Sequence, residues 1–134
     1  MHEKRIEIRW RDQDAYGHVN NAVYLTYLEE ARDEWFERTL RGEEGLEDFV
    51  IARVAIDFRR ELVLDDDEIL VTTRLVRIGS SSFTTRDEIH TKAGDLAAQA
   101  EAVLVARNRD GRGSRPLTAS ERAALEAELE PHAA

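Results

Sequence analysis

Apolar and polar residues alternate at the start of the chain. Ile6, Ile8 and Trp10 are separated by charged residues, and this period of two predicts a half-buried β-strand. The alternation stops in the segment 11–21, which is rich in Asp, Gly and Asn, the residues typical of turns and helix caps. A strand followed by a polar loop therefore opens the predicted fold.

A long helix is expected next. Asn20 or Asn21 is its candidate N-cap, whose side-chain oxygen would accept a hydrogen bond from a free backbone amide. The helix is expected to end near Leu40, so it holds about 20 residues and spans ~30 Å. Such a helix needs a broad apolar surface to pack against. Its own apolar face recurs at steps of three and four residues, at Tyr24, Leu28, Ala31 and Trp35.

Four more strands are expected after the polar segment 41–48, around 53–59, 69–78, 83–89 and 96–107. Turn signals at 79–81 and 92–95 predict hairpins, which pair strands antiparallel. The last of these strands carries mainly alanine on one face, which lets a bulky helix approach closely. A capping box begins at Thr118 and predicts a short C-terminal helix at about 118–130.

This order of elements predicts an α+β fold. The simplest way to bury the long helix is to lay it across one face of a mostly antiparallel sheet. The chain of 134 residues has the size of one ordinary domain and shows neither a linker nor an internal repeat. Residues 1–134 are therefore expected to form a single domain.

The composition excludes several classes of function. The chain has no cysteine, which excludes disulfides, cysteine-based metal sites and thiol catalysis. Its 28 acidic residues outnumber its 19 lysines and arginines, and the net charge of −9 disfavours nucleic acid as a partner. No apolar run approaches the ~20 residues of a membrane span, and no apolar signal peptide precedes the first strand. A cytoplasmic protein without nucleic-acid or membrane partners is expected.

Candidate chemistry is concentrated in the loop before the long helix. It holds two carboxylates, Asp12 and Asp14, and the imidazole of His18. The first backbone N–H groups of a helix have no partner inside it and stabilise negative charge. A carboxylate beside them is placed to act on a carbonyl whose oxygen becomes negative. Loops also need polar residues for turns, so composition alone leaves a purely structural role open.

The loop and helix start resemble a known enzyme family in their sequence motif. Asp-x-x-Gly-His-Val-Asn-Asn-x-x-Tyr at 14–24, followed by Leu-Glu-Glu-Ala-Arg at 28–32, is similar to the hotdog-fold acyl-CoA thioesterases. The bacterial long-chain acyl-CoA thioesterases resemble it most, and 4-hydroxybenzoyl-CoA thioesterase more distantly. The resemblance implies a hotdog fold, in which a curved antiparallel five-stranded sheet wraps one long central helix. It also implies hydrolysis of an acyl-CoA or acyl-carrier-protein thioester to an acid and a thiol, without a cofactor.

The resemblance further implies a role for each residue of the motif. Asp14 is the catalytic carboxylate, which either attacks the thioester carbon or deprotonates a water, and Asp12 holds the loop. The backbone N–H of Asn21 would polarise the thioester carbonyl. Gly17 would let the chain turn tightly and approach the substrate. For His18, a direct catalytic part and a structural part both remain open.

Substrate-binding residues are expected at two further places. Tyr24 lies in the motif and opens an aromatic stripe that otherwise suits the core or a subunit interface. Ser80, Ser81 and Ser82 lie in a turn whose N–H and hydroxyl groups would suit phosphate or pantetheine, although a plain hairpin turn explains them equally well. No metal site is expected, because the acidic run 65–68 lacks the spacing of a calcium loop.

Two other functions compete with thioester hydrolysis. Hotdog dehydratases act on hydroxyacyl-CoA with an Asp/His pair, and a binding module would hold acyl-CoA without catalysis. A single hotdog domain also leaves a sheet edge exposed, and the family pairs two subunits into one continuous sheet. A homodimer or a homotetramer is therefore expected.

Overall fold

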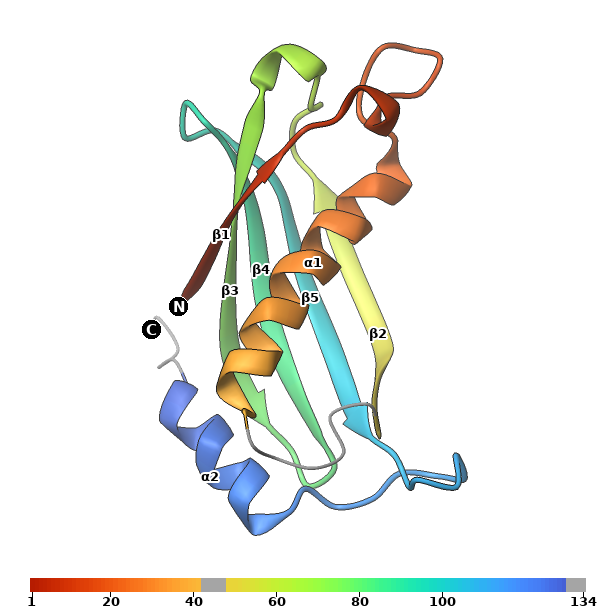
Figure 1. Ribbon diagram of the computed structural model, residues 1–134, viewed down its shortest axis with the longest axis vertical. Helices are drawn as coiled ribbons and strands as arrows, with labels where there is room; N and C mark the ends of the chain where they lie inside the picture. Colours follow the sequence, from red (N-terminus) through yellow and green to blue (C-terminus); the bar gives the residue numbers. More distant parts are fainter. Residues whose placement is uncertain (42–47, 130–134) are drawn as a thin grey trace.

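The computed structural model describes residues 1–41 and 48–129 (Figure 1). Most of the polar segment 41–48, and residue 130 at the expected end of the last helix, lie outside the described residues. The elements follow in the order β1 (His2–Glu7), the 3-10 turn η1 (Trp10–Asp12), α1 (Asn21–Thr39), β2 (Phe49–Phe58), the 3-10 turn η3 (Leu64–Asp66), β3 (Glu68–Ile78), β4 (Ser82–Thr91), β5 (Leu96–Ala106) and α2 (Ala119–Glu128). The predicted order of the helices and strands is confirmed.

The five strands form one antiparallel sheet in the order β1-β3-β4-β5-β2. The hairpins β3–β4 and β4–β5 occupy its centre, and β1 and β2 are its two edges. Figure 1 shows α1 lying across one face of this curved sheet. The predicted α+β class is therefore confirmed, with the long helix and the sheet as two packed layers.

The first strand is shorter than its sequence pattern predicts. β1 ends at Glu7, and Trp10 opens the turn η1 with 77% of its surface exposed. The cause is Asp12, whose carboxylate accepts a hydrogen bond from the backbone N–H of Arg9 at 2.9 Å. This bond bends the chain away from the sheet, so the prediction that Trp10 continues the strand was wrong.

The helix α1 begins and ends where its caps predict. The side chain of Asn20 is the N-cap and accepts from the N–H of Ala22 at 2.9 Å, so Asn21 is the first helical residue. At the other end, the N–H of Leu40 donates to the carbonyl of Phe36. The buried face meets the alanines of β5, of which Ala98 and Ala102 are fully buried. These small side chains let the aromatic residues of α1 pack close to the sheet.

A buried polar group divides the core into two apolar clusters. The group includes residues of α1 and β4. One apolar cluster beside it contains Leu28 and Ile89, and the other contains Trp35 and Phe83. The centre of the polar group is the ion pair of Arg32 and Asp87, with 3.5 Å between Nη2 and Oδ2. Burial raises the pKa of Asp87 even though Arg32 opposes the shift. Two hydroxyl residues, Thr73 and Thr85, complete the group.

Candidate active site

Asp12 anchors both ends of the loop between β1 and α1. Its buried carboxylate accepts from the N–H of Arg9 at 2.9 Å and from the hydroxyl of Tyr27, on α1, at 2.6 Å. Its backbone carbonyl accepts from the N–H of Asn20 at 3.0 Å. Burial alone would raise the pKa of Asp12, but the hydrogen bonds from Tyr27 and Arg9 outweigh it and lower that pKa. Asp12 therefore stays ionised and holds the loop, as the sequence predicts.

Asp14 sits in a tight turn inside this loop. Its backbone N–H donates to the carbonyl of His18 at 2.9 Å, and its carbonyl accepts from Gly17 at 3.2 Å. Its Oδ1 accepts from the N–H of Tyr16 at 2.9 Å, and Oδ2 has no hydrogen bond among the residues that the structure describes. Gly17 has a φ of +85°, which side chains other than that of glycine rarely adopt. The turn therefore fixes one carboxylate oxygen and leaves the other available.

His18 is turned toward a neighbouring segment rather than toward Asp14. Its Nε2 lies 3.6 Å from the carboxylate of Glu61, which follows β2, and the imidazole is 38% exposed. Within residues 1–41 and 48–129, His18 and Asp14 are joined only through the backbone bond of the turn. The structure thus gives His18 a carboxylate partner, and that partner is Glu61.

The first amide of α1 is available beside this turn. Asn20 uses its side chain on Ala22 and its carbonyl on the N–H of Val23. The N–H of Asn21, the first helical residue, has no acceptor inside the helix, and the residue is exposed. A carbonyl oxygen placed here would meet this N–H and the positive end of the helix dipole.

Tyr24 connects α1 to the segment that follows β2. Its hydroxyl accepts from the N–H of Leu62 at 3.0 Å and donates to the carbonyl of Arg60 at 3.2 Å. The ring is 3% exposed and packs edge-on against Phe58, with 5.0 Å between ring centres. Both hydrogen-bonding capacities of the hydroxyl are therefore used within the chain. The segment 60–62 is thus held beside α1 by Tyr24, and its Glu61 faces His18, although no sequence motif signals this segment.

The serine turn lies at the far end of the sheet from Asp14. Glu7 pairs with Glu68, so the Asp14 loop lies at the start of β3, whereas the turn follows the end of β3. The 11 residues of β3 span roughly 35 Å, and Figure 1 shows the two segments at opposite ends. The carbonyls of Ser80 and Ser81 accept from Leu117 and Ala106. Within one chain, the structure does not bring Ser80, Ser81 and Ser82 to Asp14.

A groove runs between α1 and the edge strand β2. It encloses about 710 Å³, a volume typical of small-molecule sites. Acidic residues of α1 form one wall and apolar residues of β2 and β5 form the other, with Arg32 in between; the lining residues are Glu29, Arg32, Asp33, Phe36, Glu37, Phe49, Val50, Ile51 and Leu104. α1 contacts β2 through the ring pairs Tyr24–Phe58 and Phe36–Phe49, yet Ile51 and Phe58 remain 44% and 46% exposed at this edge of the sheet. The groove is thus open along the sheet edge.

The described residues offer neither a metal site nor a membrane-spanning helix. Among residues 1–41 and 48–129, no three side chains of His, Asp or Glu are grouped so that they could hold a metal ion. In the same part of the chain, no helix combines the length and the apolar character needed to cross a membrane.

Comparisons with known proteins agree on one family. The family model of the thioesterase-like superfamily matches residues 8–130. The long-chain acyl-CoA thioesterase FadM of Escherichia coli is 34% identical over 83 residues, which are 60% of this chain and 62% of FadM. A second curated relative, YsmA of Bacillus subtilis, aligns over 54% of its length. The chain thus spans less than two thirds of the length of these two relatives.

Solved structures extend the likeness to nearly the whole chain. A thioesterase from Thermus thermophilus, crystallised with coenzyme A and Zn, is 36% identical with a TM-score of 0.83, covering 94% of this chain and 92% of that one. A predicted thioesterase from Bacillus stearothermophilus is 25% identical with a TM-score of 0.87, covering 98% of both chains. The expected hotdog fold is confirmed by these neighbours together with the antiparallel sheet. The chain belongs to the thioesterase-like superfamily.

Proposed function

We propose that the chain hydrolyses an acyl-CoA thioester to a free carboxylic acid and coenzyme A. The observation that carries the proposal is the pairing of two groups at one end of the molecule. One is the carboxylate of Asp14, with Oδ1 held by Tyr16 and Oδ2 available. The other is the free first amide of α1 at Asn21. A thioester carbonyl bound at the amide would present its carbon to the carboxylate.

Asp14 acts in one of two ways in this proposal. As a nucleophile it bonds to the thioester carbon, the C–S bond breaks, and water then hydrolyses the mixed anhydride. As a general base it takes a proton from a water whose oxygen attacks that carbon. In both routes the negative charge on the carbonyl oxygen is stabilised by the Asn21 N–H, and the leaving thiolate takes up a proton.

Neighbouring residues position these two groups. Gly17 allows the turn that presents Asp14, and His18 is placed with Glu61 at the rim of the site. Tyr24 acts through its ring and through the segment 60–62 that its hydroxyl holds. The dehydratase alternative requires Asp14 and His18 to act together on one substrate, and the pairing of His18 with Glu61 gives it no support.

A homodimer formed through β2 completes the proposed site. β1 is an edge covered with charged residues, whereas β2 exposes Val50, Ile51 and Phe58 by 40–46%. Antiparallel pairing of two β2 strands across a two-fold axis joins the sheets and places opposite ends of the two subunits side by side. The serine turn lies at the Phe49 end of its own subunit, because Phe49 pairs with Ala106 and Ser82 with Val105. Ser80, Ser81 and Ser82 would then meet coenzyme A bound at the Asp14 of the other subunit.

Mixing two variants, one impaired in catalysis and the other in coenzyme A binding, tests this arrangement. One variant is Asp14→Asn, and the other replaces Ser80, Ser81 and Ser82 by alanine. A heterodimer of the two contains one site with both an intact Asp14 and an intact serine turn. Activity at low acyl-CoA concentration is expected to reappear after subunit exchange. If the mixture is no more active than the sum of its components, the serines do not act across the subunit boundary.

Thiol release from a panel of acyl-CoAs tests the activity itself. Short, long and aromatic acyl groups are compared in the wild type, in Asp14→Asn and in the matched control Asp65→Asn, an exposed carboxylate at the same end of the molecule. Asp14→Asn is expected to lose at least ~100-fold in kcat, and the control to keep full activity. Acyl groups on a carrier protein are assayed in parallel. We place the reaction in the cytoplasm and assign it to residues 1–134 as one domain.

A further inference from the structure

Arg32 lies between the two walls of the groove and keeps hydrogen-bond donors that the chain does not use. Its side chain is 3% exposed and lines the groove. A guanidinium carries five N–H donors, and one of them makes a long hydrogen bond of 3.5 Å from Nη2 to Asp87. The Nε is buried and has no partner among the described residues. Unused donors of a buried cation therefore lie beside the groove.

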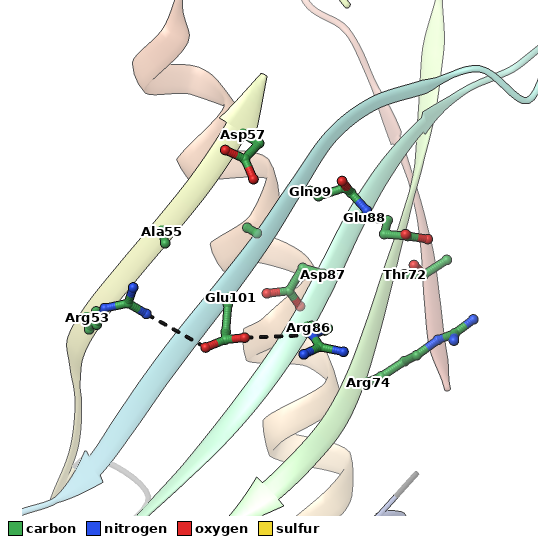
Figure 2. A pocket seen from close by; sticks show the side chains of 11 residues that line it. Arg53, Ala55, Asp57, Thr72, Arg74, Arg86, Asp87, Glu88, Gln99 and Glu101 are labelled. Carbon is green, nitrogen blue, oxygen red and sulfur yellow. Dashed lines mark ion pairs between the residues drawn. The ribbon is translucent and has the colours of Figure 1, made fainter. Parts of the chain in front are cut away.

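The ion pair with Asp87 does not by itself explain Arg32. Figure 2 shows Asp87 between Arg86 and Glu88 on β4; the alternation of the strand turns Asp87 toward α1, and these two neighbours line the opposite face of the sheet. One oxygen of Asp87, Oδ1, is buried without a partner. Apolar residues of similar volume often replace such a buried ion pair without loss of stability. A gain in stability is therefore a weak reason for a cation at this place.

Three carboxylates of α1 supply acceptors on the wall beside Arg32. Glu29, Asp33 and Glu37 follow one another every four residues and are exposed toward the groove. Like charges at this spacing destabilise a helix. Burial raises the pKa of Asp33 and Glu29 raises it further, whereas Arg32 opposes the shift. Asp33 and Arg32 are thus close enough to act on one bound group.

We infer that the groove binds an acyl chain that carries a hydroxyl group about ten carbons from the thioester. The inference rests on the proposed thioesterase function and names its substrate class. A hydroxyl accepts a hydrogen bond from the guanidinium of Arg32 and donates one to the carboxylate of Asp33. A carboxylate at the same place is repelled by the acidic wall, and an ammonium is repelled by Arg32. A plain hydrocarbon end leaves both groups without a partner.

The position of Arg32 along α1 sets the place of the hydroxyl on the chain. From Asn21, where the thioester carbonyl is proposed to bind, the helix rises roughly 16 Å to Arg32. Helical side chains lean toward the N-terminus, which brings the guanidinium to about 12 Å. An extended chain of about ten carbons covers this distance, because a C–C bond is about 1.5 Å long and the chain zigzags. Leu25 and Phe58, 42% and 46% exposed, leave apolar surface between the two places.

Thiol release from four matched acyl-CoAs tests the inference. The substrates are decanoyl-CoA, ω-hydroxydecanoyl-CoA, β-hydroxydecanoyl-CoA and ω-carboxynonanoyl-CoA. In the wild type, kcat/KM is expected to be at least about tenfold higher for the ω-hydroxy substrate than for decanoyl-CoA. The β-hydroxy substrate is expected to show no such gain, because its hydroxyl lies near Asp14, and the ω-carboxy substrate is expected to react more slowly than decanoyl-CoA.

Two variants locate the preference at the groove. In Arg32→Met/Asp87→Leu, apolar side chains replace the ion pair, and the ratio of the two kcat/KM values is expected to fall to about one. In Asp33→Leu, at an exposed position, the ratio is expected to fall by roughly threefold or more. The control Glu30→Leu removes an exposed carboxylate on the other side of α1 and is expected to keep both the activity and the ratio. Circular dichroism of each variant confirms folding, and Asp33→Leu carries the test if the double variant does not fold.

Binding separates a failure of this inference from a failure of the proposed function. Calorimetry with Asp14→Asn compares the dissociation constants of decanoyl-CoA and ω-hydroxydecanoyl-CoA, and tighter binding of the hydroxylated ester is expected. Such a preference without turnover in the wild type supports the inference and contradicts the proposed function. Turnover without a preference in either assay overturns the inference alone. A preference that persists in both groove variants also overturns it, because the hydroxyl is then recognised elsewhere.

Discussion

Removing the hydroxyl of Tyr27 tests how the active-site loop is held. Tyr27→Phe keeps the buried ring in α1 and deletes one hydrogen bond, the 2.6 Å contact with the carboxylate of Asp12. That carboxylate is 3% exposed, so water cannot replace the lost donor. A hydrogen bond to a charged group contributes ~1.5–3 kcal/mol to stability. The free energy of unfolding is expected to fall by about 2 kcal/mol.

The pH dependence separates this cause from a general packing defect. The pKa of Asp12 is lower in the folded chain than in the unfolded one, where it is about 3.9. Its contribution to stability is therefore fully present above about pH 4 and is lost as the pH falls through the folded-state pKa. The difference between wild type and Tyr27→Phe is expected to be constant near neutrality and to shrink below about pH 4.

Urea denaturation at a series of pH values measures both quantities. The matched control is Tyr16→Phe, because the side chain of Tyr16 is 84% exposed and its loss is expected to change stability by less than ~0.5 kcal/mol. Thiol release at about 25 °C is expected to show a lower kcat for Tyr27→Phe, because a looser loop misplaces Asp14. A stability within about 0.5 kcal/mol of wild type at neutral pH, or a difference that does not change with pH, refutes the reasoning.

Three further experiments probe other parts of the account. Arg32→Met leaves Asp87 buried without its cation, so the free energy of unfolding measured by urea denaturation is expected to fall by ~3–5 kcal/mol. The double variant Arg32→Met/Asp87→Leu is expected to recover most of this loss, and equal stability of the single and double variants would contradict the prediction. Burial lowers the pKa of His2, so the contribution of His2 to folding stability is present above pH 6.5 and is lost as the pH falls. In His2→Gln, the free energy of unfolding is expected to change less with pH between about pH 7 and 5, and an unchanged pH dependence excludes this role of His2. Gly17→Ala and Gly94→Ala both force alanine to a positive φ at ~1–2 kcal/mol, yet only Gly17→Ala is expected to lower kcat.

The fold could be predicted because local signals agree with the global arrangement. The Asn20 cap, the spacing of Tyr24, Leu28 and Trp35, and the alanines of β5 all specify one helix on one sheet. The alternating pattern wrongly predicted that Trp10 continues the first strand. The strand ends earlier because the Arg9 amide donates a hydrogen bond to Asp12, and the alternation of apolar and polar residues does not reveal this bond.

The candidate site was less accessible from the sequence. The motif identifies Asp14, Gly17 and the helix start, which are neighbours in the chain. It is silent on Glu61 and on the segment held by Tyr24, because these reach the loop through tertiary contacts between residues far apart in sequence. The separation of Ser80 from Asp14 follows only from the strand register, which no local pattern specifies.

The most direct test of the account compares single-turnover thiol release by wild type and Asp14→Asn on the best acyl-CoA of the panel. The substitution keeps the size and hydrogen-bonding shape of the side chain and removes its negative charge. The account predicts loss of at least ~100-fold in rate with unchanged folding and unchanged binding of product coenzyme A. A folded Asp14→Asn protein that releases thiol at the wild-type rate contradicts the central claim that this carboxylate carries the reaction.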